Sequence, residues 1–158
     1  MIKIITLILI SFYLINNCFA KQPDFLVHSH PHKNIEQLVQ SKTKSDMSYK
    51  ELMEKFGTAY SMIQEGLIRE DKIFIEMGLD TIQNHPTTKN NPWEIVKAKD
   101  TEAFKATLLY FDEQLHKSTL DITNSLKTNN WIEINKKIFN LSNNCINCHI
   151  IWKDNLDK

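Results

Sequence analysis

The sequence predicts an all-α protein, specifically an antiparallel four-helix bundle. Only three Gly and four Pro occur among 158 residues, a composition that favours helices over a turn-rich β fold. Four segments carry apolar residues three and four positions apart, which is the spacing of one buried helix face. Most connections between these segments are short, and four amphipathic helices can bury such faces only against one another.

The first long helix is predicted to begin near Ser48 and to end at a turn marked by Gly66. Ser48-x-x-Glu51 fits a capping box, in which the two side chains satisfy the first backbone N–H groups of a helix. Asn34-x-x-Gln37 fits the same pattern, so a start at Asn34 is an alternative. The apolar face consists of Tyr49, Leu52, Met53, Phe56, Tyr60 and Ile63.

The second helix is predicted over residues 70–84, because His85-Pro86 cannot continue it. Its apolar stripe consists of Ile75, Leu79 and Ile82. A linker over residues 86–100 follows, and Pro92 begins a short helical turn within it.

The third helix is predicted over residues 101–127, with Phe104, Leu108, Phe111, Leu115 and Ile122 on its buried face. The fourth begins at the capping box Asn130-x-x-Glu133 and extends to about Lys153. Its buried series is Ile134, Ile138, Leu141, Cys145, Cys148 and Trp152. Two cysteines therefore share the inner face of the last helix.

Residues 1–20 are predicted to form a secretory signal peptide. Lys3 precedes an apolar run over residues 4–15, and a small-x-small segment ends at Ala20. The run is shorter than the ~20 residues that cross a bilayer. We therefore expect cleavage after Ala20, a periplasmic location and no membrane span, with an uncleaved anchor as the alternative.

Residues 21–45 are predicted to be a flexible N-terminal lead-in, and the bundle is placed at residues 46–158. Pro23 and Pro31 interrupt the lead-in, and its beginning has no helical period. It contains His28, His30 and His32. A flexible segment gives these imidazoles no fixed coordination geometry, which argues against a metal site there.

The charge balance excludes several kinds of partner. Lys and Arg number 19, as do Asp and Glu, so no net charge favours nucleic acid or an anionic membrane. No nucleophile–base pair, paired carboxylates or phosphate loop is recognisable, and we expect no enzyme activity. His85 and His116 have no partners at metal-ligand spacing and are interpreted as surface residues.

Cys145-Ile146-Asn147-Cys148-His149 matches the C-x-x-C-H pattern of c-type haem attachment. Residues three apart lie on one helix face, so both thiols can add to the two vinyl groups along one haem edge. The imidazole of His149 can then ligate the iron as the proximal base. The segment predicts one covalently attached haem c.

Other interpretations of these cysteines are less favourable. A zinc site needs further paired ligands, and no second C-x-x-C or H-x-x-x-H occurs. A thioredoxin-like disulfide expects a βαβ pattern, which is absent from the sequence. A haem-free helical bundle with a metal or a disulfide at this segment remains an alternative.

The chain resembles the cytochrome c′ family, the class II c-type cytochromes, which are exported four-helix bundles with the haem motif near the C-terminus. The resemblance covers residues 46–155. It rests on Cys145-x-x-Cys148-His149 followed by Trp152-Lys153, on Phe104, and on Leu52-Met53-Glu54. Glu54 departs from the basic residue of the family, and the linker before the third helix is short.

The resemblance implies roles around the iron. Low-spin members of the family place a Met opposite the proximal His, and here that residue is Met53, whose soft thioether suits an electron carrier. Met47 and an open site are alternatives, and a Met in an apolar stripe is often simply part of the core. Lys153 is expected to shield the His149 imidazole or pair with a haem propionate, as in the family, or to be solvated.

The sequence therefore predicts an exported monohaem electron-transfer protein that docks transiently with redox partner proteins. The resemblance also implies a homodimer formed through the first two helices. A five-coordinate haem protein that binds or senses NO or CO is the alternative if the distal face is open.

Overall fold

The computed structural model describes residues 32–156, and the predicted signal peptide lies outside them. Within this part of the chain the regular elements are all helical, apart from two isolated bridges, Lys44–Thr87 and Val96–Leu156. The elements are α2 (Ile35–Ser41), α3 (Tyr49–Ile68), α4 (Lys72–Gln83), η1 (Pro92–Ile95), η2 (Ala98–Asp100), α5 (Thr101–Leu126) and α6 (Trp131–Trp152). The predicted all-α class is confirmed.

Both predicted capping segments near the N-terminus are real helix starts, but of two different helices. The Ser48 hydroxyl oxygen accepts a hydrogen bond from Glu51 N at 3.3 Å, and Ser48 N donates to Glu51 Oε2 at 2.7 Å, so α3 has a full capping box. Asn34 caps the separate helix α2, where its Oδ1 accepts from Gln37 N at 2.9 Å.

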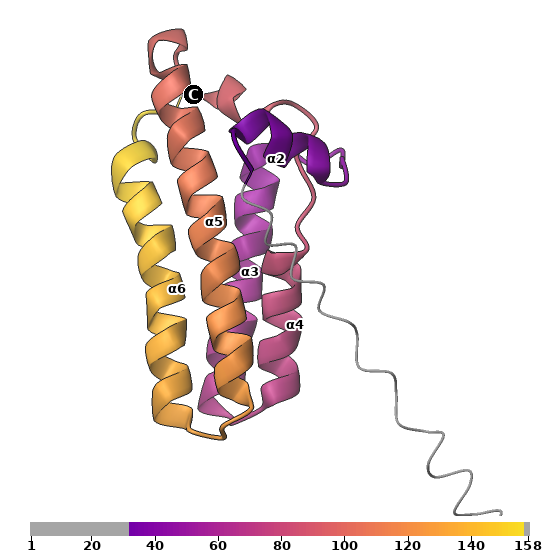
Figure 1. The fold of residues 1–158 in the computed structure, drawn as a ribbon, viewed down its shortest axis with the longest axis vertical. Coiled ribbons are helices and arrows are strands. Elements are labelled where there is room, and N and C mark those ends of the chain that lie inside the picture. Colours follow the sequence, from indigo (N-terminus) through magenta and orange to yellow (C-terminus); the bar gives the residue numbers. More distant parts are fainter. Residues whose placement is uncertain (1–31, 157–158) are drawn as a thin grey trace, which may run out of the picture.

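Helix α2 lies inside the segment predicted to be a flexible lead-in. Ile35 and Leu38 are one helical turn apart, and both are buried. Helix α2 packs against α5 and lies across one end of the long helices (Figure 1). Residues 35–41 are therefore part of the packed structure, because the side chains of Ile35 and Leu38 are buried where α2 contacts α5.

Gly66 does not form the predicted turn but lies buried within α3. A Cβ on Gly66 would come within 2.8 Å of Ile75 Cγ1 and 2.9 Å of the Asp71 carbonyl oxygen. Its lack of a side chain thus allows α4 to approach α3 closely. The reversal comes later, at Glu70, whose φ of 54° is left-handed.

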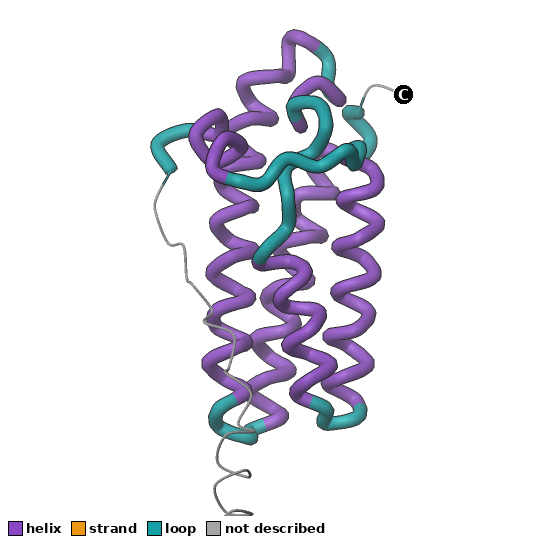
Figure 2. The backbone as a smooth tube through the Cα atoms, turned by 90° about the vertical axis from the view of Figure 1, so that its right-hand side faces the viewer, coloured by secondary structure: helices purple, strands orange, loops and turns teal. Residues whose placement is uncertain are grey.

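The four long helices α3, α4, α5 and α6 lie side by side (Figures 1 and 2). Their main core lies toward the end that carries the α3–α4 and α5–α6 turns. It consists of Ala59, Ile63, Ile75, Leu79, Ile82, Ile122, Leu126, Ile134, Ile138 and Leu141. The opposite end of the long helices, beneath α2 and the linker before α5, contains a cavity. Among residues 32–156, none of the helices combines the length and apolarity that a bilayer crossing requires.

Candidate functional site

A cavity of about 340 Å³ lies between α2, α3, α5 and α6 and the residues that follow α4. This volume is within the range of small-molecule and cofactor sites. The α3 wall is apolar and consists of Tyr49, Leu52, Met53, Phe56, Gly57 and Tyr60. Most of these residues belong to the apolar stripe predicted for the first long helix.

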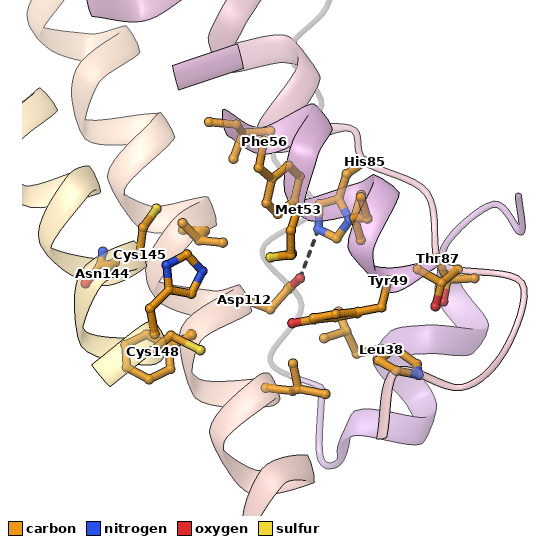
Figure 3. A pocket seen from close by; sticks show the side chains of 18 of the residues that line it. Leu38, Tyr49, Met53, Phe56, His85, Thr87, Asp112, Asn144, Cys145 and Cys148 are labelled. Carbon is orange, nitrogen blue, oxygen red and sulfur yellow. Dashed lines mark hydrogen bonds and ion pairs between the residues drawn. The ribbon is translucent and has the colours of Figure 1, made fainter. Parts of the chain in front are cut away.

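The cysteine pair lies on the α6 wall of this cavity, as Figure 3 shows. Cys145 and Cys148 are half-buried, are one helical turn apart and are not joined in a disulfide. Burial raises the pKa of the Cys145 thiol, and burial together with the nearby Cys145 charge raises the pKa of Cys148 to about 11. Both sulfurs are therefore protonated at neutral pH, whereas metals and disulfides react with the thiolate.

His149 lines the rim of the cavity but is exposed. It follows Cys148 directly, within the last turn of α6. Lys153 is the exposed C-cap residue of this helix, and its backbone N–H donates to the His149 carbonyl oxygen at 3.0 Å. Lys153 does not belong to the cavity wall.

The two candidate methionines occupy different places. Met53 lines the cavity from α3, and its side chain extends toward the α6 face that carries Cys145 (Figure 3). Met47 precedes the N-cap of α3, where its carbonyl oxygen accepts a hydrogen bond from Lys89 N at 2.8 Å, and it is not a lining residue. Only Met53 of these two faces the cysteine pair across the cavity.

Aromatic residues close the end of the cavity beside Cys148. Phe104 is 1% exposed and meets Trp152 edge to face, with ring centroids 4.9 Å apart. Tyr49 packs against Phe104 in a similar geometry at 6.3 Å. Cys148 borders the same cluster. The residues of the family resemblance on α5 and at the end of α6 therefore meet in space.

A charged cluster lies where α5 meets the segments that follow α2 and α4, and sequence analysis missed it. The His85 side chain is 8% exposed, and its Nε2 lies 3.0 Å from Asp112 Oδ1. The Lys42 ammonium lies 2.6 Å from the same oxygen, and His116 Nε2 lies 3.6 Å from Asp112 Oδ2. The interpretation of His85 and His116 as surface residues is wrong, because both pack around the Asp112 carboxylate.

The cluster has a defined charge distribution. Burial by itself would raise the pKa of the Asp112 carboxyl, but the hydrogen bond with His85 and the charge of Lys42 outweigh it and hold this pKa well below its usual value. Burial lowers the pKa of His116 to about 4, although Asp112 opposes the shift. At neutral pH Asp112 is therefore ionised and His116 is neutral.

The sequence carried only one sign of this cluster, the spacing of four residues that puts Asp112 and His116 on the same face of a helix. Lys42 and His85 come from the segments that follow α2 and α4. Their approach to Asp112 depends on how the helices pack.

No protein-family model matches this chain, and neither the curated proteins nor the solved structures include a significant match. Functional inference therefore rests on the residues around the cavity.

Proposed function

We propose that this protein is an exported c-type cytochrome that transfers electrons through one covalently attached haem. In this proposal α3, α4, α5 and α6 form an antiparallel four-helix haem bundle of the cytochrome c′ type. The observation that carries the proposal is the position of Cys145 and Cys148, side by side on the helix face that lines an apolar cavity. A bound haem would supply the one-electron couple between Fe(II) and Fe(III).

Each wall has a role in this proposal. The two thiols of α6 would form the thioether links, and the imidazole of His149 would turn from the rim to ligate the iron. Met53 would provide the thioether on the opposite side, because it faces the cysteine pair from α3 whereas Met47 lies outside the cavity. The apolar side chains of α3 and the cluster at Phe104 would exclude water from the ring.

The donor set around the cysteines supports attachment over the competing hypotheses. Burial raises the pKa of both thiols, which disfavours the reactive thiolate of a redox disulfide. The donor set also fits a haem, since two thiols, an imidazole and a thioether border a single cavity. Lys153 lies one turn beyond His149 and would shield the imidazole from solvent rather than line the ring.

Location and partners follow from the same proposal. Haem attachment of this kind takes place outside the cytoplasm, so the proposal requires residues 1–20 to direct export. The protein would exchange electrons with redox partner proteins in transient complexes, because its near-neutral charge provides little electrostatic steering. A homodimer through α3 and α4 is part of the family resemblance.

The first test is covalent attachment. The full chain would be expressed with its signal peptide in a host that matures c-type cytochromes, and the product analysed by mass spectrometry and by haem staining after denaturing electrophoresis. We expect the mass of the polypeptide plus one haem, and loss of the stain in a Cys145→Ser/Cys148→Ser variant. Colourless protein with the mass of the polypeptide alone would contradict the proposal.

The second test concerns the sixth ligand. The reduced wild-type protein should give sharp low-spin bands that do not respond to CO. Met53→Ala should convert the spectrum to one that shifts with CO, whereas Met47→Ala, the matched control, should leave it unchanged. A wild-type spectrum that already responds to CO would instead favour the five-coordinate NO or CO binder.

A further inference from the structure

The charged cluster on the cavity wall has the composition of a metal site. His85, Asp112 and His116 each offer one ligand atom, and these three atoms lie within 4.8 Å of one another. Two imidazoles and a carboxylate are a ligand set found for Zn²⁺ and for other divalent transition metals. Nothing in the attachment of a haem at Cys145 and Cys148 uses these side chains.

We propose that His85, Asp112 and His116 form a second, separate binding site for a divalent transition-metal ion of the zinc class. Lys42 holds the site when the metal is absent, because its ammonium lies against Asp112 and His85. The ion would have three protein ligands, with a further position open toward the cavity, which Asp112 and His85 both line (Figure 3).

The orientation of the His85 ring suits a metal ligand. His85 Nδ1 lies 3.0 Å from the Pro86 carbonyl oxygen, so Nδ1–H donates to that oxygen and Nε2 is the ring nitrogen directed at Asp112 and Lys42. A histidine that binds a metal through one ring nitrogen commonly donates the N–H of its other ring nitrogen to a group such as a backbone carbonyl. Nε2 and Asp112 Oδ1 lie 3.0 Å apart, and the Lys42 ammonium lies 2.5 Å from the first and 2.6 Å from the second.

His116 supplies the second imidazole. Its Nε2 is buried and has no hydrogen-bond partner among the described residues, which is uncommon for a polar atom.

The side chains around His116 are compatible with a ring proton on Nδ1 and a lone pair on Nε2. The Gln83 amide contacts both His116 Nδ1, at 3.4 Å, and the Thr119 hydroxyl. Thr119 has one hydroxyl proton, and its hydroxyl lies 2.8 Å from the His116 carbonyl oxygen. In the structure the Gln83 amide nitrogen faces His116 Nδ1 and the amide oxygen accepts from the Thr119 hydroxyl. The reverse orientation of the amide would let its oxygen accept from Nδ1–H of His116 and its NH₂ donate to Thr119, whose own proton would then go to the His116 carbonyl oxygen. Amide oxygen and nitrogen are assigned from such networks, and the reverse orientation leaves the lone pair on His116 Nε2.

The distances require a modest contraction. Zn–N and Zn–O bonds of about 2.0–2.2 Å place the ligand atoms of a tetrahedral site about 3.3 Å apart. The observed separations are 3.0 Å from His85 Nε2 to Asp112 Oδ1 and 3.6 Å from His116 Nε2 to Asp112 Oδ2. These distances involve the two different oxygens of Asp112, and the three ligand atoms lie within 4.8 Å of one another. Entry of the ion therefore requires the imidazoles to move toward one carboxylate oxygen as well as the departure of Lys42.

The test is a calorimetric titration of ZnCl₂ into the full exported chain after EDTA treatment. His28, His30 and His32 are first replaced by Gln, since these side chains could bind zinc independently. We expect one Zn²⁺ per chain. Asp112→Asn and His116→Gln should each weaken binding by at least about tenfold, as loss of a metal-site group does. Glu113→Gln, the control at the neighbouring exposed carboxylate, should leave it unchanged.

Lys42→Met separates a metal site from a purely structural ion pair. It should tighten zinc binding, because the competing ammonium is gone. In EDTA this variant should melt at a lower temperature than the parent chain, and zinc should restore its melting temperature, since a ligand that binds only the folded state stabilises it. A chain destabilised by Lys42→Met that zinc does not rescue would overturn the proposal, as would zinc binding that is unchanged in Asp112→Asn.

Far-UV circular dichroism of each variant shows whether a lost signal reflects unfolding. A Cys145→Ser/Cys148→Ser variant separates this site from the haem segment. We expect it to retain the zinc site in the haem-free chain, and a loss of all zinc binding in that variant would overturn the proposal. Because zinc is titrated into both the parent chain and this haem-free variant, the outcome can be distinguished from the success or failure of the cytochrome proposal.

Discussion

The Lys42 ammonium lies 2.6 Å from the Asp112 carboxylate, and only 12% and 14% of the two side chains are exposed. Lys42 is the C-cap residue of α2, and Asp112 lies in the middle of α5. The ion pair thus ties the short helix that covers the cavity to a long helix of its wall. Because both charges are largely buried, each depends on the other for compensation.

Removing one partner of this pair should cost more than removing both. Lys42→Met in the metal-free chain leaves the Asp112 carboxylate buried without its cation, and such a loss costs about 3–5 kcal/mol. Lys42→Met/Asp112→Leu should recover most of this loss, because an apolar pair of similar volume carries no desolvation penalty. Guanidinium unfolding in EDTA measures both free energies, and additive effects of the two substitutions would contradict the coupling.

Gly78 should be essential to the contact between α3 and α4. A Cβ at this position would lie 2.6 Å from the Ala59 carbonyl oxygen and 2.6 Å from Ile63 Cγ1. Because a helix backbone cannot yield, Gly78→Ala should push the helices apart and lower the free energy of unfolding by about 1–3 kcal/mol.

Gly57→Ala is the matched control within α3. A Cβ there would meet no atom within 4 Å. We expect this substitution to stabilise the haem-free chain by roughly 0.5–1 kcal/mol, because Ala loses less backbone entropy than Gly in a helix. Equal effects of the two substitutions, measured by thermal unfolding, would contradict the assigned close approach at Gly78.

The cysteines should react slowly with iodoacetamide in the haem-free folded chain. The raised pKa of Cys148, about 11 instead of 9.0, reduces its thiolate at pH 8 roughly a hundredfold. Its alkylation rate should therefore rise with pH until about pH 11, and guanidinium should abolish the protection. Mass spectrometry of peptides follows each site. Rapid labelling of the folded chain at pH 8 would contradict the burial of these thiols.

The aromatic contact at the end of the cavity should be a major source of stability. Phe104→Ala removes the ring that packs edge to face on Trp152, and truncation of a buried Phe costs about 3–5 kcal/mol. Phe139, which is 62% exposed on α6, is the control. Phe139→Ala should change the free energy of unfolding by no more than about 0.5 kcal/mol. A similar loss in both variants would show that Phe104 has no special role.

Several local features were predictable because they depend on residues within one or two helical turns. The caps at Ser48 and Asn130 follow from hydrogen bonds across three positions. The full capping box is confirmed at Ser48, whereas at Asn130 only the side chain caps the helix and Asn130 N donates to Thr128 Oγ1 instead. The spacing of three between Cys145 and Cys148 predicts a shared helix face, and both thiols do face the cavity. The all-α class follows from the same periodicity.

Other features depended on how the helices pack against one another. In the sequence Gly66 suggested a turn. Only the close approach of Ile75 shows that Gly66 instead lies where α3 packs against α4. Met47 and Met53 were both candidates in the sequence, and only the course of α3 separates them.

The sequence by itself determined where most helices begin, which faces they bury and which helix face carries the cysteines, because backbone hydrogen bonds and apolar periodicity act over a few residues. Only the tertiary structure decided that Lys42 and His85 meet Asp112, across separations of 70 and 27 residues. Those contacts depend on the relative positions of entire helices, which no short pattern specifies.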